Sequence, residues 1–208
     1  MELQYFGANC IKLTTKKVTI TIDDNLADLG AKSVTKAGDI SLFTGAHGDV
    51  SAESKITIDK PGEYEVSNIS IQGVPARSHL NEEGKYGATI YKLLVEDLRI
   101  AIVGHIYPAL SSSQLEAIGI VDILIIPVGG SGYTLDPVGA LKVIKDIEPK
   151  LIIPTHYEDA SLNYPVPQQS LEEALKTLAV EPHETTAKLK VKAGEFGEGN
   201  KLVVLERQ

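Results

Sequence analysis

The feature that most restricts the fold of this chain is a series of short, β-branched segments that fills its first half. Turn-forming residues separate these segments, a pattern typical of β-strands rather than helices. The predicted strands are residues 4–6, 11–14, 17–22, 40–43, 56–58 and 69–74. Their short connections predict a largely antiparallel meander. Pro61 and Gly62 are the pair that favours a tight reversal, so we expect a hairpin at residues 60–63.

The second half of the chain alternates predicted strands with helical patterns. Strands are expected at residues 89–95, 98–103, 122–127 and 151–153, and two more, 187–191 and 201–205, close the chain. Amphipathic helices are expected at residues 113–118, 137–147 and 170–178. The second helix has Asp136 as a typical N-cap, followed by Pro137. Because such helices must cover the face of a sheet, we predict two mixed sheets packed face to face, with helices on both outer faces. No repeat or linker divides the chain, so residues 1–208 form one domain.

The composition excludes several classes of function. Apolar residues make up 43% and charged residues 23% of the 208 residues, as in a soluble globular protein. The formal charge of −8 disfavours binding to nucleic acid or to anionic membranes. The longest apolar run, residues 120–128, falls short of the ~20 residues that cross a bilayer. The chain does not open with a basic segment followed by an apolar one, so we expect a cytoplasmic protein.

The histidines are the residues that point to chemistry. Cys10 is the only cysteine, so any metal ion must be held by histidine and carboxylate. Four of the five histidines follow a predicted strand: His47, His79, His105 and His156. If the strands are neighbours, these imidazoles converge on one rim, and imidazole is the commonest protein ligand for metals. His183 is expected to lie apart. The alternative is that each is an ordinary loop histidine.

The sequence also resembles a known family. Residues 44–50, TGAHGDV, resemble the T-H-x-H-x-D-H signature of hydrolases with the metallo-β-lactamase fold. The rest of the chain is similar to the small cytoplasmic members grouped with ascorbate-6-phosphate lactonase-like proteins. The matching stretches are residues 5–10 (YFGANC), 61–66 (PGEYEV), 123–130 (ILIIPVGG) and 149–157 (PKLIIPTHY). The resemblance implies a four-layer αββα sandwich and a hydrolytic metal site.

The resemblance also shows which ligands are missing. The family has histidine at the positions of Gly45 and Val50, and often at that of Ala8. It implies ligand roles for His47, Asp49, His79 and His156, and places His105 where a metal-bridging aspartate belongs. A carboxylate can join two ions ~3.5–4 Å apart, whereas the two nitrogens of an imidazole diverge. A standard two-metal centre is therefore not expected.

One zinc ion, or none, remains compatible with the sequence. His105 can join Asp49 and His156, or His47 and His79, to give the three protein ligands of a catalytic zinc site. Zinc would lower the pKa of its bound water to ~7 for attack on an ester, lactone or phosphoester, and Asp49 would orient that water or act as general base.

The alternative to this metal site is a metal-free polar cluster in an inactive member that binds a small ligand or a partner protein.

Two further features carry weaker hypotheses. Tyr157 follows His156 and is a candidate to donate a hydrogen bond to a substrate oxygen, with a packing role as the alternative. The glycines of residues 129–132 precede a predicted helix and could bind an anion through their amides, or form only a tight turn. A nucleic-acid-processing enzyme of the same fold is disfavoured, because the chain is acidic and has no added basic domain. The expected partner is a small-molecule substrate or ligand.

Overall fold

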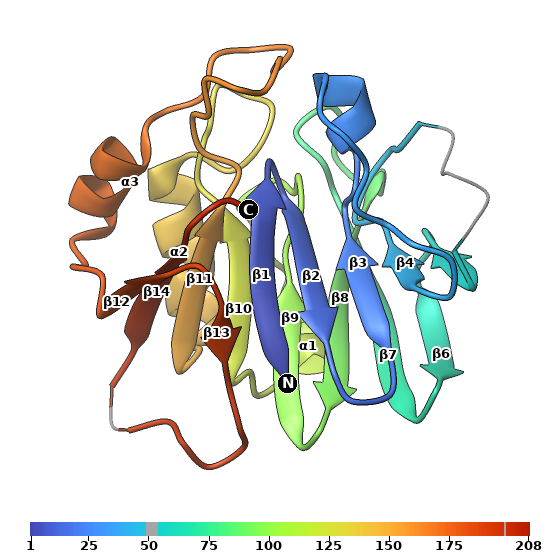
Figure 1. Ribbon diagram of the computed structural model, residues 1–208. Helices are drawn as coiled ribbons and strands as arrows, with labels where there is room; N and C mark the ends of the chain where they lie inside the picture. The colour runs from blue at the N-terminus through green and yellow to red at the C-terminus, as the bar shows by residue number, and fades with distance from the viewer. Residues whose placement is uncertain (49–53, 198) are drawn as a thin grey trace.

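The fold consists of two mixed β-sheets packed face to face, as predicted (Figure 1). The computed structural model describes residues 1–48, 54–197 and 199–208, so the predicted ligand Asp49 lies outside the described residues. The first sheet has six strands in the order β13 (Leu189–Lys190), β1 (Glu2–Gly7), β2 (Cys10–Thr14), β3 (Thr19–Ile22), β4 (Ile40–Leu42) and β5 (Ile56–Ile58).

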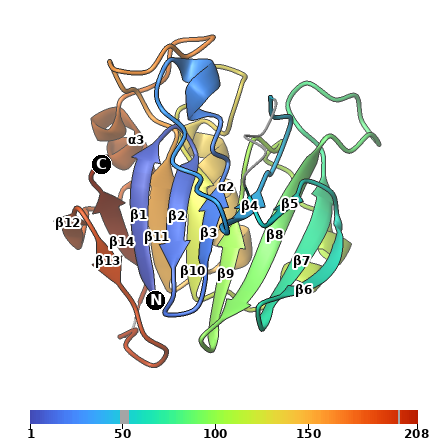
Figure 2. The ribbon, with the colours of Figure 1, turned by 45° about the vertical axis from the view of Figure 1, so that its right-hand side comes forward.

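The second sheet has eight strands, of which those at one side pair in parallel and those at the other side pair antiparallel. Its order is β12 (Glu184–Thr186), β14 (Lys201–Leu205), β11 (Leu151–Thr155), β10 (Ile123–Pro127), β9 (Leu98–Ile102), β8 (Ala88–Val95), β7 (Ile69–Ala76) and β6 (Gly62–Val66). Strands β12 to β9 pair in parallel, and β9 to β6 pair antiparallel. Figure 2 shows β1 to β3 of the first sheet lying over β9 to β11 of the second.

Strand alternation builds the core between the sheets. In β1, Leu3 and Tyr5 are buried, whereas Glu2 and Gln4 on the other face are partly exposed. The buried face packs with Ile100 and other residues of the second sheet in one apolar cluster. Each apolar side chain removed from water contributes roughly 1.5–3 kcal/mol, so this cluster fixes which face of each strand points inward.

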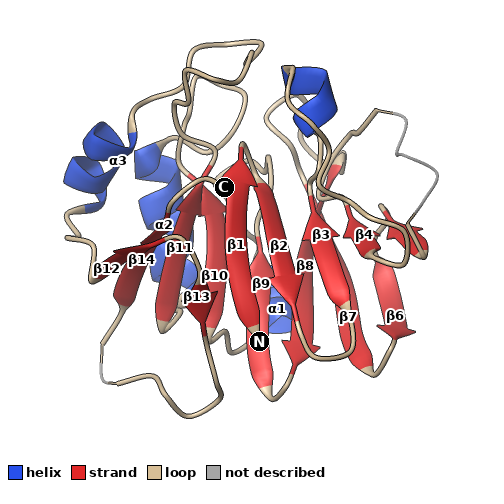
Figure 3. Ribbon diagram, viewed as in Figure 1, coloured by secondary structure: helices blue, strands red, loops and turns tan. Residues whose placement is uncertain are grey.

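Among the described residues, the three α-helices lie on one side of the sandwich rather than on both. Helices α1 (Ser112–Ile118), α2 (Pro137–Ile147) and α3 (Leu171–Leu178) all bury apolar residues in a second cluster, on the outer face of the eight-stranded sheet (Figure 3). None of the helices in the described residues has the length and apolar character needed to span a bilayer.

The outer face of the six-stranded sheet is covered differently. Most of its outward positions are polar, such as Lys12 and Thr21, and only a small apolar cluster at one end joins Cys10 to Leu26 of the β3–β4 connection. The β3–β4 connection lies there instead, and includes the short helix η1 (Leu26–Leu29). Lys12 Nζ donates to the carbonyl oxygen of Val34, and Thr35 Oγ1 donates to Thr21 Oγ1. The Asp24 carboxylate holds this connection by accepting from the amides of Val34 and Thr35.

Two local predictions for the first half were wrong. Residues 60–63 do not form a hairpin: they carry the chain from β5 in one sheet to β6 in the other. A proline–glycine pair reverses the chain but does not determine which strands pair. The hairpin lies between β6 and β7, where Ser67 and Asn68 have φ of 55° and 64°, as a type I′ turn requires. The first half is also not a simple meander, because β3, β4 and β5 pair in parallel.

Candidate functional site

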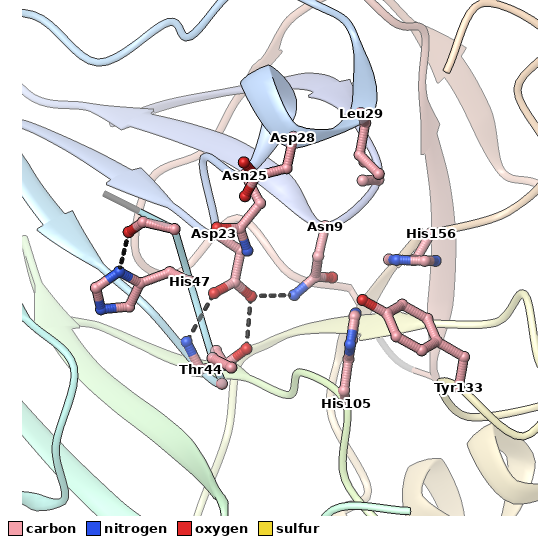
Figure 4. A pocket seen from close by; sticks show the side chains of 14 residues that line it. Asn9, Asp23, Asn25, Asp28, Leu29, Thr44, His47, His105, Tyr133 and His156 are labelled. Carbon is pink, nitrogen blue, oxygen red and sulfur yellow. Dashed lines mark hydrogen bonds between the residues drawn. The ribbon is translucent and has the colours of Figure 1, made fainter. Parts of the chain in front are cut away.

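A pocket of about 210 Å³ opens at one end of the sandwich, where strand ends of both sheets meet. Figure 4 shows its lining side chains. The segments after β1, β3 and β4 contribute Asn9, Asp23 and Thr44 from the first sheet. The segments after β9 and β11 contribute His105 and His156 from the second. The pocket therefore lies at the ends of the strands that His105 and His156 follow.

A buried carboxylate, Asp23, is the most highly connected group in this pocket. It follows β3, and its side chain is 5% exposed. Its Oδ1 accepts from the backbone amide of Thr44 at 2.6 Å, and its Oδ2 accepts from Thr44 Oγ1 at 2.6 Å and from Asn9 Nδ2 at 2.5 Å. Burial raises the pKa of Asp23, and the bonds from Thr44 and Asn9 oppose that shift. Both carboxylate oxygens are thus engaged within the protein.

Hydrogen bonds and close packing link Asp23 to the chain segments that carry both pocket histidines of the second sheet. Thr44 packs so closely on Gly104 that a Cβ added there would collide with the threonine hydroxyl, and Gly104 immediately precedes His105. On the other side, Thr155 Oγ1 donates to Asn9 Oδ1 at 2.5 Å. Thr155 immediately precedes His156. One carboxylate therefore ties together the chain segments that carry the two imidazoles.

His105 and His156 face each other across the floor of the pocket. Their ring centroids are 4.7 Å apart, and the rings meet edge to face at 83°. The ring of Tyr133 lies 4.7 Å from that of His105, and Figure 4 shows the Tyr133 hydroxyl close to both histidines. Burial lowers the pKa of His105 to about 3 and that of His156 to about 4. Both imidazoles are therefore neutral at neutral pH, with nitrogen lone pairs that can accept a proton or bind a metal.

His156 is held in an unusual backbone conformation. Its φ of 53° lies in the left-handed region, and its amide donates to the carbonyl oxygen of Ala8 at 2.6 Å. Ala8 has a φ of 49° and donates its own amide to Tyr164 Oη at 3.2 Å. Such conformations cost of order 1–3 kcal/mol and persist where the surroundings determine them. The Ala8–His156 contact thus fixes the place of the imidazole.

His47 lines the same pocket but is turned towards a different partner. Its ring packs on Phe43 with centroids 4.2 Å apart. Its Nδ1 lies 2.8 Å from the carbonyl oxygen of Gly48, and its Nε2 lies 3.3 Å from Asp59 Oδ2. Figure 4 shows His47 on the far side of Asp23 from the pair formed by His105 and His156. The structure therefore does not bring His47 into that pair.

The other predicted residues lie outside the pocket lining. His79 packs edge-on against Tyr107, with ring centroids 5.7 Å apart, and its buried Nε2 has no hydrogen-bond partner among the residues that the structure describes. Tyr157 packs on Tyr5 at 5.5 Å, and its hydroxyl donates to the carbonyl oxygen of Leu205, which matches the packing alternative. His183 also lies outside the lining, as expected.

Three of the four predicted histidines, His47, His105 and His156, line this pocket, whereas His79 lies outside its lining. Within residues 1–48, 54–197 and 199–208, no three His, Cys, Asp or Glu side chains are placed to hold a metal ion. His105 and His156 come together, but Asp59 and Phe43 hold His47, and His79 faces Tyr107. The described residues alone do not fit a bound metal, because a catalytic zinc needs three protein ligands.

Sequence reasoning missed Asp23, Asn9 and Tyr133. The predicted site contained mainly histidines. Asp23 is a carboxylate directly after the β-branched strand Thr19–Ile22, so it has the same position relative to a strand as those histidines. That signal was present in the sequence. Nothing local marks Tyr133, because it reaches the pocket from the long segment between β10 and α2.

Comparison with known proteins agrees with this architecture. The family described as β-lactamase superfamily domain matches residues 2–156, about three quarters of the chain. The chain belongs to the metallo-β-lactamase superfamily. A UPF0173 metal-dependent hydrolase of Thermus thermophilus is 28% identical over 192 residues, which cover 76% of this chain and 84% of that protein. A relative of the same description from Salinibacter ruber is 25% identical over 193 residues, with 76% and 85% covered.

A solved structure supports the same superfamily fold. It is a candidate Zn-dependent hydrolase of the metallo-β-lactamase superfamily from Thermotoga maritima, which this chain matches with a TM-score of 0.76 at 24% identity. The match covers 100% of this chain and 99% of that one. The superfamily fold is thus found along the whole chain, while the chemistry of its site must be argued from the residues it contains.

Proposed function

We propose that this protein is a superfamily hydrolase whose metal centre has been reduced to at most one divalent ion, at the pair of His105 and His156. The observation that carries the proposal is the 4.7 Å edge-to-face contact of two neutral imidazoles in the pocket, with His47 held away by Asp59. The reaction class is supported by the relatives described as metal-dependent hydrolases.

A second ion lacks a bridge. Two-metal hydrolysis uses a group that spans ions ~3.5–4 Å apart, and the residue at the expected bridging position is His105. Asp23 does not replace it, because both of its oxygens already accept hydrogen bonds from Thr44 and Asn9. Gly45 has no side chain to donate. On this proposal, neither His105 nor Asp23 supplies the bridging carboxylate that would hold two ions together.

The chain's own residues have definable roles at this site. A bound ion would lower the pKa of its coordinated water. His105 and His156 supply two neutral nitrogen donors, and Asp49 remains the predicted third ligand and general base, outside the described residues. Burial raises the pKa of Tyr133, so its hydroxyl stays protonated and can donate a hydrogen bond to a substrate oxygen. Tyr133 takes the role first considered for Tyr157.

The lining charge restricts the substrate. Among the described residues that line the pocket, Asp23 and Asp28 are acidic and none is Lys or Arg. Phosphate is normally bound by cationic side chains or helix N-termini. A neutral ester or lactone therefore suits this pocket better than a phosphoester.

A second candidate function is a metal-free pocket that binds a small neutral or cationic ligand. It is favoured by the internal hydrogen bonds of Asp23 and the contact of His47 with Asp59, since these satisfy the polar groups without an ion. The two candidates differ in metal content, and removal of metal would abolish ligand binding or turnover only in the first.

The test is zinc titration by calorimetry on native protein that was first treated with chelator and dialysed. The proposal predicts one equivalent at most, lost in His156→Ala because a ligand of the pair is removed. His183→Ala is the matched control, because this exposed histidine lies outside the pocket, and it should bind as the native protein does. Equal zinc binding by native protein and His156→Ala would refute the assignment, and no binding by the native protein would favour the metal-free candidate.

A further inference from the structure

The side chain of Gln168 lies directly behind His156, outside the lining of the pocket. It is 9% exposed, and its Oε1 or Nε2 could in principle face the imidazole, since the two ends of an amide have the same shape. The structure places one amide end 3.2 Å from His156 Nδ1. The other end lies 3.0 Å from the carbonyl oxygen of Val166 and 3.4 Å from that of Pro167.

The two carbonyl oxygens decide which way the amide points. A carbonyl oxygen only accepts hydrogen bonds, so the end of Gln168 that faces Val166 and Pro167 must be the NH₂ group, which donates. Its Oε1 must then face His156 Nδ1. An amide oxygen only accepts, so the hydrogen bond exists only if Nδ1 carries the proton. The surroundings of Gln168 therefore determine the position of a proton on His156.

A glycine makes this arrangement possible. A Cβ added at Gly129 would collide with the carbonyl oxygen of His156 and with Oε1 of Gln168. Gly129 also accepts the amide of Gln169 through its carbonyl oxygen at 2.8 Å, which holds the following segment in place. The glycine at 129 thus has a role in close packing behind His156.

We infer that Gln168 is a positioning residue that fixes His156 in the Nδ1–H tautomer, so that the Nε2 lone pair is the one available to the pocket. His156 is 2% exposed and has no hydrogen bond at Nε2 in the described structure. That nitrogen is then the proton acceptor towards a substrate, or the donor atom towards an ion, because an outer partner on the other nitrogen fixes the ring and its tautomer. The inference names the reactive atom of the proposed site, but it concerns the metal-free protein and stands without any bound ion.

The test is long-range proton–nitrogen NMR of protein labelled with ¹⁵N-histidine, without metal and at a pH where His156 is neutral. The His156 signals are assigned by their loss in His156→Asn. The expected native result is a protonated-type shift at Nδ1 and a lone-pair-type shift at Nε2. The reverse pattern in the native protein would overturn the inference without any variant.

Variants then show whether Gln168 is the cause. Gln168→Leu removes the acceptor and should give a mixture of tautomers or the Nε2–H form, whereas Gln168→Glu keeps an acceptor and should retain Nδ1–H. Gln169→Leu is the matched control, because it makes the same change at an exposed neighbour and should leave the tautomer unchanged. A pure Nδ1–H form in a folded Gln168→Leu protein would also contradict the inference. This NMR test measures neither activity nor zinc binding. Its outcome is therefore independent of whether the proposed hydrolase function is correct.

Discussion

A single buried carboxylate organises the site at the level of residues. Asp23 receives three hydrogen bonds, and through Thr44 and Asn9 it reaches the segments that precede both histidines of the pair. In Asp23→Ala, the three donors would be left buried without an acceptor. Since a hydrogen bond to a charged group is worth about 1.5–3 kcal/mol, we expect the free energy of unfolding to fall by about 3 kcal/mol or more in urea denaturation.

Asp28→Asn is the matched control for this change. Asp28 lines the same pocket from η1 but is exposed and keeps its solvent contacts on substitution, so its unfolding free energy should change by less than about 0.5 kcal/mol. Equal stability of the two variants would show that the Asp23 network does not hold the pocket together.

The sequence indicated some of these residues and not others, for physical reasons. His105 and His156 could be predicted because each follows a buried strand, and parallel neighbouring strands end at the same edge of a sheet. The orientations of His47 and His79 could not be predicted. Their neighbours Asp59 and Tyr107 come from other parts of the chain. Gln168 was also hidden, because its effect on His156 depends on the placement of two carbonyl oxygens.

At the level of elements, an ion-pair cluster lies at the opposite end of the strands that precede His105 and His156. Asp122, which precedes β10, accepts from the backbone amide and guanidinium of Arg99 in β9 and from Lys150 before β11. Hydrogen bonds from Arg99, joined by one from Lys150, hold the pKa of Asp122 well below its usual range. The folded state therefore binds fewer protons at Asp122 than the unfolded state does in acid.

This difference predicts how stability depends on pH. The contribution of Asp122 is fully present above the unfolded pKa of ~3.9 and is lost as the pH falls towards the lower folded value. Between pH 6 and pH 3, the native protein should thus lose at least about 1 kcal/mol more unfolding free energy than Asp122→Asn. The control is Asp97→Asn, an exposed acid in the β8–β9 turn that should keep the native slope. Parallel pH profiles for native protein and Asp122→Asn would contradict this account.

The elements themselves were largely predictable, with exceptions that have a common cause. Strands β8 to β11 and β14 and helices α2 and α3 are close to their predicted bounds, because apolar periodicity and N-caps such as Asp136 are local signals, whereas β12 was not predicted. Strand partners are not local: the turn at Pro61 joins different sheets, and β6 was missed because its residues are mostly polar and only partly buried.

At the level of the whole molecule, the two outer faces of the sandwich differ in how apolar they are and in what covers them. The outer face of the eight-stranded sheet is apolar and is covered by all three described α-helices. That of the six-stranded sheet is mostly polar and is covered by the β3–β4 connection, which Asp24 anchors and whose Leu26 packs with Cys10. The sandwich itself followed from the strand pattern and the family resemblance, whereas the order of helices along the chain does not show which outer face each helix covers.

We propose that this chain retains the superfamily fold but not a two-metal centre. The test adds the missing groups back in one variant, Gly45→His, Val50→His and His105→Asp, which supplies a nitrogen donor at each of two positions and a carboxylate at the bridging one. Loss of groups that merely orient ligands weakens metal binding 10–100-fold, so loss of ligands should weaken it at least as much.

The deciding measurement is the number of zinc ions bound per chain, by elemental analysis and titration, in native protein and in this triple variant. The account predicts one weakly bound ion or none in the native protein and two in the variant. Two tightly bound ions in the native protein would contradict it.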